Sequence, residues 1–109
     1  MNMIYLSDFE KVEIKIGKIL NASKVENSDK LIKLEVDFGT EKRQILTAMA
    51  EYFKAEDFLG KKMPFIINLE YRKIRGLESQ GMILACDGSD GKPVFLIPER
   101  DTKEGSKVG

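Results

Sequence analysis

The segment Ile32-Lys33-Leu34-Glu35-Val36-Asp37-Phe38 alternates apolar and charged residues without a break. Strict alternation is typical of a β-strand with one buried face, because successive side chains point to opposite sides of a strand. Val12-Glu13-Ile14-Lys15-Ile16 repeats the pattern upstream. Gly17 then predicts a bulge or sharp bend before the strand resumes over 19–22, and Asn27-Ser28-Asp29 forms a turn. A period of two therefore indicates a β protein.

The chain beyond this segment predicts further short strands and one helical region. Gly39-Thr40 turns into a third strand over 43–47, which pairs with the second as a hairpin. One or two short helices are expected over 50–53 and 55–59, because these residues lack alternation and end at Gly60. Three apolar runs complete the predicted strands: 65–69, which Pro64 limits to an edge or bulge position at its start, and 82–86 and 94–97, which a hairpin loop over 87–91 joins.

These elements predict an all-β fold in a single domain over residues 1–109. Six or so short strands with a helix after the third favour a small barrel. The expected architecture is an oligonucleotide-binding (OB) fold barrel of about five strands, with a short helix after the third strand and a C-terminal β extension. An SH3-like barrel or a sandwich is the alternative.

Composition excludes several kinds of chemistry. The 109 residues contain no histidine, so catalytic triads and imidazole-based acid or base catalysis are absent, and one cysteine forms neither an internal disulfide nor a thiolate metal cage. We expect no metal and no cofactor. Acidic neighbours such as Glu56 and Asp57 lie where carboxylates cap helices, so we do not expect an enzyme. Neither a membrane-spanning run nor a secretory signal is visible, which predicts a cytoplasmic protein that binds no membrane.

The charges balance over the whole chain, with 18 basic and 18 acidic residues, but they are unevenly distributed. Residues 60–76 carry five cations and one acid, Glu70, whereas both flanks are net acidic. The five cations are Lys61, Lys62, Arg72, Lys73 and Arg75. Such a concentration is what a localised anion-binding site requires.

Several motifs in one order carry a family resemblance. They are Asp29-Lys30-Leu31, Arg43-Gln44-Ile45, Gly60-Lys61-Lys62, Asn68-Leu69 and, most specifically, Arg72-Lys73-Ile74-Arg75-Gly76-Leu77-Glu78-Ser79-Gln80-Gly81-Met82. From about Phe9 to Val108 the chain resembles the tRNA-binding OB-fold family, which occurs at the C-terminus of methionyl-tRNA synthetase, as its separate β chain, or as a stand-alone dimeric protein. Three positions depart from the family pattern: Glu70-Tyr71, Ala48 and Ala55.

The resemblance implies a non-catalytic domain that grips folded tRNA by shape and backbone. It also implies a homodimer, with the methionyl-tRNA synthetase catalytic chain as a further partner. The expected tRNA-binding residues are cations for phosphates, polar groups for ribose or base edges, and one apolar contact: Lys30, Lys61, Lys62, Arg72, Lys73, Arg75, Ser79, Gln80 and Met82. Lys33 is a further candidate for tRNA contact, but the resemblance favours it less than Lys30. Aromatic candidates for base stacking are Tyr5, Tyr52, Phe53 and Tyr71.

The main alternative is a dimeric, export-type chaperone on the same fold that binds unfolded polypeptide. A chaperone needs an exposed apolar groove but has no use for five clustered cations. Two further expectations concern packing. Cys86 ends an apolar run and is expected to be a small buried residue. Residues 98–109 are expected to pack across the dimer surface.

Overall fold

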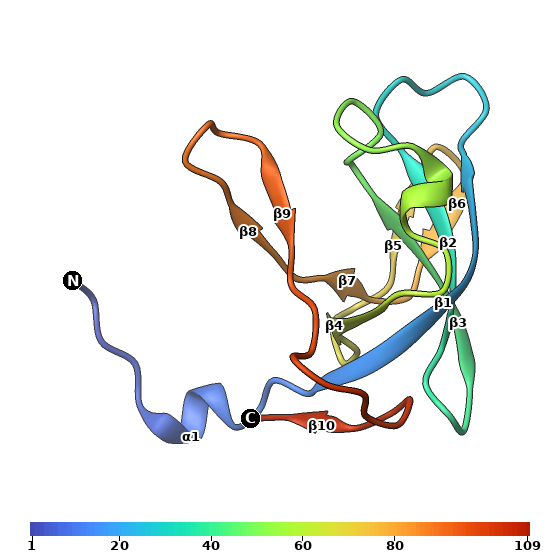
Figure 1. Cartoon of the computed structure of the whole chain (residues 1–109). Helices are drawn as coiled ribbons and strands as arrows, with labels where there is room; N and C mark the ends of the chain where they lie inside the picture. Colours follow the sequence, from blue (N-terminus) through green and yellow to red (C-terminus); the bar gives the residue numbers. More distant parts are fainter.

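The computed structural model describes residues 1–109, which form an almost entirely β structure (Figure 1). In chain order the elements are α1 (Leu6–Phe9), β1 (Ile14–Lys24), β2 (Ile32–Asp37), β3 (Lys42–Thr47), the 3-10 helix η1 (Ala55–Asp57), β4 (Lys62–Ile66), β5 (Arg72–Ile74), β6 (Leu77–Ser79), β7 (Met82–Ile83), β8 (Ala85–Asp87), β9 (Pro93–Phe95) and β10 (Lys107–Val108). The main sheet has the order β3-β2-β1-β4-β7, with β10 added to β1. Neither helix has the length and apolar character needed to span a membrane.

The long strand β1 organises the sheet. All its pairings are antiparallel: its second half pairs with β2, its first half with β4, and its first two residues with β10. The sheet curls around a core whose centre includes the fully buried Ile19, Leu34, Ile45 and Phe65. This nearly closed sheet confirms the expectation of an all-β, OB-like barrel.

The bulge expected at Gly17 lies a little further on. The register of β1 against β2 shifts between Ile19 and Asn21, and the strand runs through Gly17 without interruption. Gly17 is required for a different reason: a Cβ there would lie 2.4 Å from Val36 Cγ1 and 2.7 Å from Phe38 Cε1. The glycine therefore allows the core side chains of β2 and the residue after it to pack against the β1 backbone.

The barrel closes between β3 and the segment that follows β6, and two side chains complete this closure. The Gln80 N–H donates to the Gln44 carbonyl oxygen (2.8 Å), and the Gln44 N–H donates to Gln80 Oε1 (3.0 Å). Two residues further along β3, the Leu46 N–H donates to Oγ of Ser79, the last residue of β6 (3.0 Å). On the edge of β3 that faces away from β2, the backbone N–H groups of Gln44 and Leu46 thus donate to side-chain oxygens.

The C-terminal segment closes one end of the barrel, which confirms the expected β extension. Ile14 pairs with Val108, and Ile16 exchanges backbone hydrogen bonds with Gly105 (2.7 Å) and Ser106 (2.8 Å). The segment therefore packs on its own barrel, while Ile97 just before it stays 52% exposed.

Several predicted elements differ in extent. The helical region contains only η1, and the strand expected over 65–69 begins at Lys62. Pro64 lies inside that strand opposite Ile16 of β1, but the Ile16 backbone bonds to Gly105 and Ser106 instead, so the β1 ladder needs no N–H from Pro64. On its other side the Pro64 carbonyl accepts the Leu84 N–H (3.0 Å), and β7 pairs only with the two residues after the proline. The apolar run over 82–86 divides into β7 and β8. The β5–β6 hairpin was not predicted.

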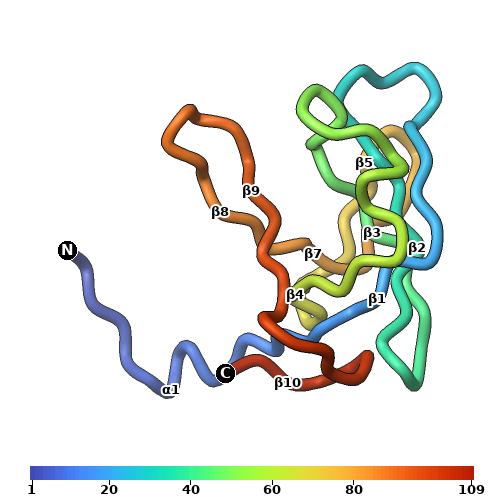
Figure 2. Tube along the Cα trace, viewed as in Figure 1, coloured from blue at the N-terminus to red at the C-terminus, as the bar shows by residue number.

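The prediction that Cys86 is buried is wrong, because its thiol is exposed. Cys86 lies on β8, and β8 pairs only with β9. The resulting hairpin projects away from the barrel, as does the N-terminal segment before β1 (Figures 1 and 2).

Candidate functional site

The β5–β6 hairpin presents three cations together. Its register pairs Arg72 with Ser79 and Lys73 with Glu78, and the turn at its tip contains Arg75. The side chains of Arg72, Lys73 and Arg75 are exposed, and none of them forms a salt bridge. Cations that lack an acidic partner remain available for an external anion.

A small second core holds this hairpin in place. Val25, Leu31 and Leu46 form a buried cluster, and Ile74 and Leu77 of the hairpin pack against it. The hairpin is therefore fixed against the loop between β1 and β2, which itself carries the exposed Lys30.

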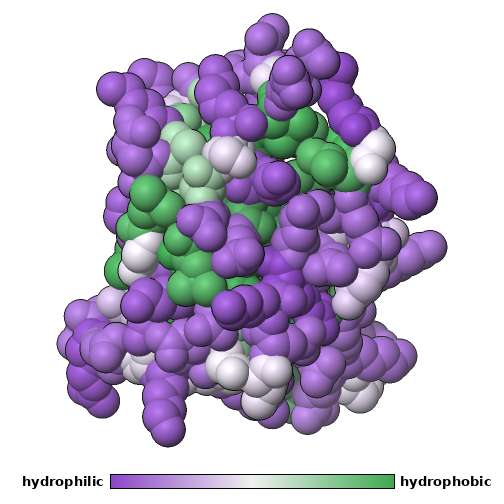
Figure 3. Space-filling view, turned by 90° about the vertical axis from the view of Figure 1, so that its right-hand side faces the viewer, coloured by the Kyte–Doolittle hydropathy of each residue, from purple (hydrophilic) through white to green (hydrophobic).

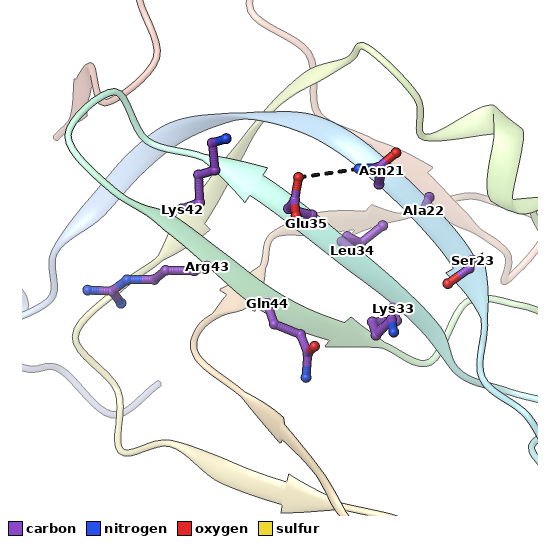
Figure 4. A pocket seen from close by; sticks show the side chains of 9 residues that line it. All are labelled: Asn21, Ala22, Ser23, Lys33, Leu34, Glu35, Lys42, Arg43 and Gln44. Carbon is purple, nitrogen blue, oxygen red and sulfur yellow. Dashed lines mark hydrogen bonds between the residues drawn. The ribbon is translucent and has the colours of Figure 1, made fainter.

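The outer face of β1, β2 and β3 forms a shallow polar groove of about 490 Å³ (Figure 4). Lys33, Lys42 and Gln44 line it, and Asn21 Nδ2 donates to Glu35 Oε1 across it (3.3 Å). Figure 3 shows the side of the molecule that carries these strands: hydrophilic residues cover most of it, and a band of apolar residues crosses it. The alternation of β2 predicts that Lys33 lies on the polar face of the strand, but the sequence does not predict the groove that it lines.

Arg43 is a residue whose role the sequence did not reveal. Its guanidinium forms a two-point contact with the Glu41 carboxylate (2.8 and 3.3 Å) and donates to the carbonyl oxygens of Gln80 (3.0 Å) and Ile67. The hydrogen bond between the two side chains raises the pKa of Arg43 and lowers that of Glu41. Because its charge is already paired, Arg43 acts here as a clamp between β3 and the chain on either side of the hairpin.

The two remaining cations of the basic segment lie elsewhere. Lys61 and Lys62 line a separate concavity together with Lys18 and Arg100. Lys61 donates to the Asp57 carbonyl oxygen and lies 5.3 Å above the centre of a phenylalanine ring, that of Phe95. The structure thus divides the five-cation segment into two groups.

Lys62 is fully engaged by the C-terminal segment. Its ammonium contacts Asp101 Oδ1 (2.8 Å) and Glu104 Oε1 (3.2 Å) and donates to the Thr102 carbonyl oxygen (2.6 Å). The hydrogen bond to Asp101 is the main reason that the pKa of Lys62 is raised and that of Asp101 is lowered. In this arrangement Lys62 anchors the segment that closes the barrel.

The polar candidates of the Ser-Gln-Gly-Met motif are placed by the barrel. Ser79 is buried, and its hydroxyl both accepts from Leu46 and donates to the Gly81 carbonyl oxygen (3.1 Å). Gln80 is half-buried, and its amide joins Gln44 to Glu78. Met82 is 42% exposed and lines an apolar hollow beside Arg72. Contact of these three residues with RNA stays a prediction.

The aromatic candidates differ in accessibility. Tyr5, Tyr52 and Tyr71 are exposed, and the Arg43 guanidinium lies 5.8 Å from the centre of the Tyr71 ring. Phe53 instead stacks on Phe95 (4.1 Å between ring centres) and packs against the core.

Comparison with known protein families identifies the kind of domain that this chain forms. The family model described as "Putative tRNA binding domain" matches residues 14–107. The methionine–tRNA ligase of Parabacteroides distasonis is 42% identical over 105 residues, which is 96% of this chain and 16% of the ligase. The chain thus spans about a sixth of this relative, and the match falls on a tRNA-binding domain rather than on the catalytic domain.

Solved structures of other proteins have the same fold as this chain. A methionyl-tRNA synthetase (MetRS) related protein from Pyrococcus horikoshii superimposes with a TM-score of 0.95 at 37% identity, with each chain fully covered. The chaperone CsaA from Bacillus anthracis superimposes with a TM-score of 0.88 at 24% identity, covering 99% of this chain and all of the chaperone. At that identity the second likeness concerns the fold alone.

Proposed function

Because the chain belongs to the tRNA-binding domain family, we propose that it is a non-catalytic domain that grips folded tRNA by shape through a basic surface. In this proposal the domain serves methionyl-tRNA synthetase as an accessory subunit or C-terminal domain. Its contribution is affinity for tRNA, while aminoacylation belongs to the partner's catalytic domain.

One observation carries the proposal: the β5–β6 hairpin holds three exposed cations without ion pairs beside a polar groove that contains Lys33 and Lys42. Phosphate contacts from arginine and lysine supply most of the affinity of shape-reading RNA proteins. The hairpin, the β1–β2 loop with Lys30, and the outer face of β2 and β3 form the proposed interface. Lys61 and Lys62 belong to it only if tRNA also reaches the C-terminal segment.

A fluorescence titration tests this proposal. The full chain is titrated with intact folded tRNA and with an unstructured RNA of the same length, each at two salt concentrations. We expect tighter binding to folded tRNA and a salt dependence of several units in log Kd per log salt, because several phosphates are contacted. Equal affinity for the two RNAs, or no binding, would contradict a shape-reading tRNA domain.

Exposed apolar residues favour a second candidate function, binding of unfolded polypeptide. Ile4, Tyr5 and Leu6 are at least 70% exposed, and Leu96 and Ile97 are 39% and 52% exposed. A chaperone would use such a surface. Capture of a permanently unfolded protein that excess tRNA does not displace, combined with no preference for folded tRNA, would favour this candidate.

We assign these exposed apolar residues to the contact surface of a homodimer. Leu96 and Ile97 border an apolar hollow of about 230 Å³ formed with Ile16, Pro64 and Val108. Apolar side chains exposed to this degree are stabilised when a second copy covers them. We expect sedimentation to give twice the chain mass, and the double variant Ile4→Lys/Leu6→Lys to give the single mass with an unchanged circular dichroism spectrum. A monomeric wild type would contradict the assignment.

A further inference from the structure

A cleft of about 430 Å³ separates the β1–β2 loop from the β5–β6 hairpin. Three cations line it, Lys24 and Lys33 from the two strands that the loop joins and Arg75 from the hairpin tip, together with the single acid Glu26. None of these four residues forms a salt bridge. We call this the cationic cleft. Three like charges around one concavity repel each other until an anion enters.

The walls of the cationic cleft are held by packing. Val25 and Leu31 of the β1–β2 loop are buried with Leu46, and Leu77, which lines the cleft, packs on them. A cleft whose two walls share a buried cluster is formed before its ligand arrives. Little ordering cost then remains for the anion to offset.

The backbone conformation of Arg75 also supports a role for its side chain in the cationic cleft. Arg75 has φ of 52° and Gly76 has φ of 80°, as in a two-residue hairpin turn of the type that favours asparagine or glycine at its first position. A long side chain with positive φ costs about 1 kcal/mol relative to glycine. Such a residue persists where its side chain has a use, and here the side chain lines the cationic cleft.

We propose that Lys24, Lys33 and Arg75 together bind one phosphate of an RNA backbone in the cationic cleft. This rests on the proposed function and deepens it, because it names the point at which the tRNA backbone is held. Arginine supplies a planar fork for two phosphate oxygens, and the lysines supply point charges around the rest of the group. One phosphate shared by three cations is a defined site, unlike a diffuse basic patch.

The test uses Lys24→Gln, Lys33→Gln and Arg75→Asn, singly and combined, in the full chain. Each is titrated with folded tRNA over a series of salt concentrations. We expect each single change to weaken binding about tenfold, as the loss of one charged hydrogen bond does. Because one phosphate is shared, the triple variant should lower the salt slope by about one unit, whereas three independent contacts would lower it by about three.

Two controls separate binding from folding and from overall charge. Arg75→Asn should melt at or above the wild-type temperature, because asparagine tolerates positive φ better than arginine. Lys92→Gln removes an exposed, unpaired lysine on the β8–β9 turn and should leave affinity unchanged.

The outcomes distinguish this inference from the proposed function. If the wild type binds folded tRNA but the triple variant binds as tightly, the cationic cleft is overturned and the function stands. A loss as large in Lys92→Gln, or a slope change near three in the triple variant, would also overturn the shared site. If the wild type does not bind folded tRNA, the proposed function fails and the cleft assignment fails with it.

Discussion

Replacing Ser79 with alanine tests whether its hydroxyl holds the barrel closed. The side chain is 6% exposed, accepts the Leu46 N–H at 3.0 Å and donates to the Gly81 carbonyl oxygen at 3.1 Å. Without the hydroxyl, the buried Leu46 N–H has no partner. An unsatisfied buried donor costs about 1–3 kcal/mol. For a domain of this size we expect Ser79→Ala to melt at least about 4 °C below the wild type.

Thermal melting followed by circular dichroism measures this difference, with Ser89→Ala as the matched control. Ser89 is exposed on the β8–β9 turn, and its hydroxyl forms no hydrogen bond within the protein, so its loss should shift the melting temperature by less than about 1 °C. A shift as small for Ser79→Ala would refute the closing role. Loss of tRNA affinity at a temperature where that variant is as stable as the wild type would instead assign the Ser79 hydroxyl to RNA.

Three further predictions concern packing, charge and exposure. Gly17→Ala places a methyl 2.4 Å from Val36 Cγ1 and should lower the free energy of unfolding in urea by about 1–3 kcal/mol; a loss under about 0.5 kcal/mol would contradict this. The pKa of Glu104 is lowered by its own backbone N–H and then by Lys62, so its stabilisation is present above the ordinary carboxyl pKa and lost as pH falls through the lower folded value. Amide NMR shifts of β10 should therefore change in acid, and less so in Lys62→Met. Native Cys86 should react with iodoacetamide as fast as in urea, and strong protection would place it in a core.

The strands of the sheet could be predicted from sequence where alternation was long enough to define a face. The segment Ile32–Phe38 supplied four apolar positions at a period of two, and its strand was found nearly as expected. The β5–β6 hairpin has three residues in each strand, too few to define a period, and Arg75 replaces the asparagine or glycine that usually marks its turn type. Its position depends on packing against a cluster from other strands.

In the candidate site, closeness in sequence does not predict which cations lie on the same surface. Lys62 and Arg72 are neighbours in a basic segment, yet strand β4 carries Lys62 to the C-terminal segment, where two carboxylates pair with it. Lys24 was not among the candidate contacts and Lys33 was favoured less than Lys30, yet the fold places both around the same cleft as Arg75. Which cations share a surface is decided by tertiary packing.

The pairing of Ile14 with Val108 sets an order for folding. These residues lie near opposite ends of the described chain, so their contact closes a very long loop, and such contacts form late and slow the approach to the native state. On a ribosome, β1 and β2 can pair long before β10 emerges. The nascent barrel therefore passes through a stage in which one end is open and the backbone of Ile16 is still bonded to water.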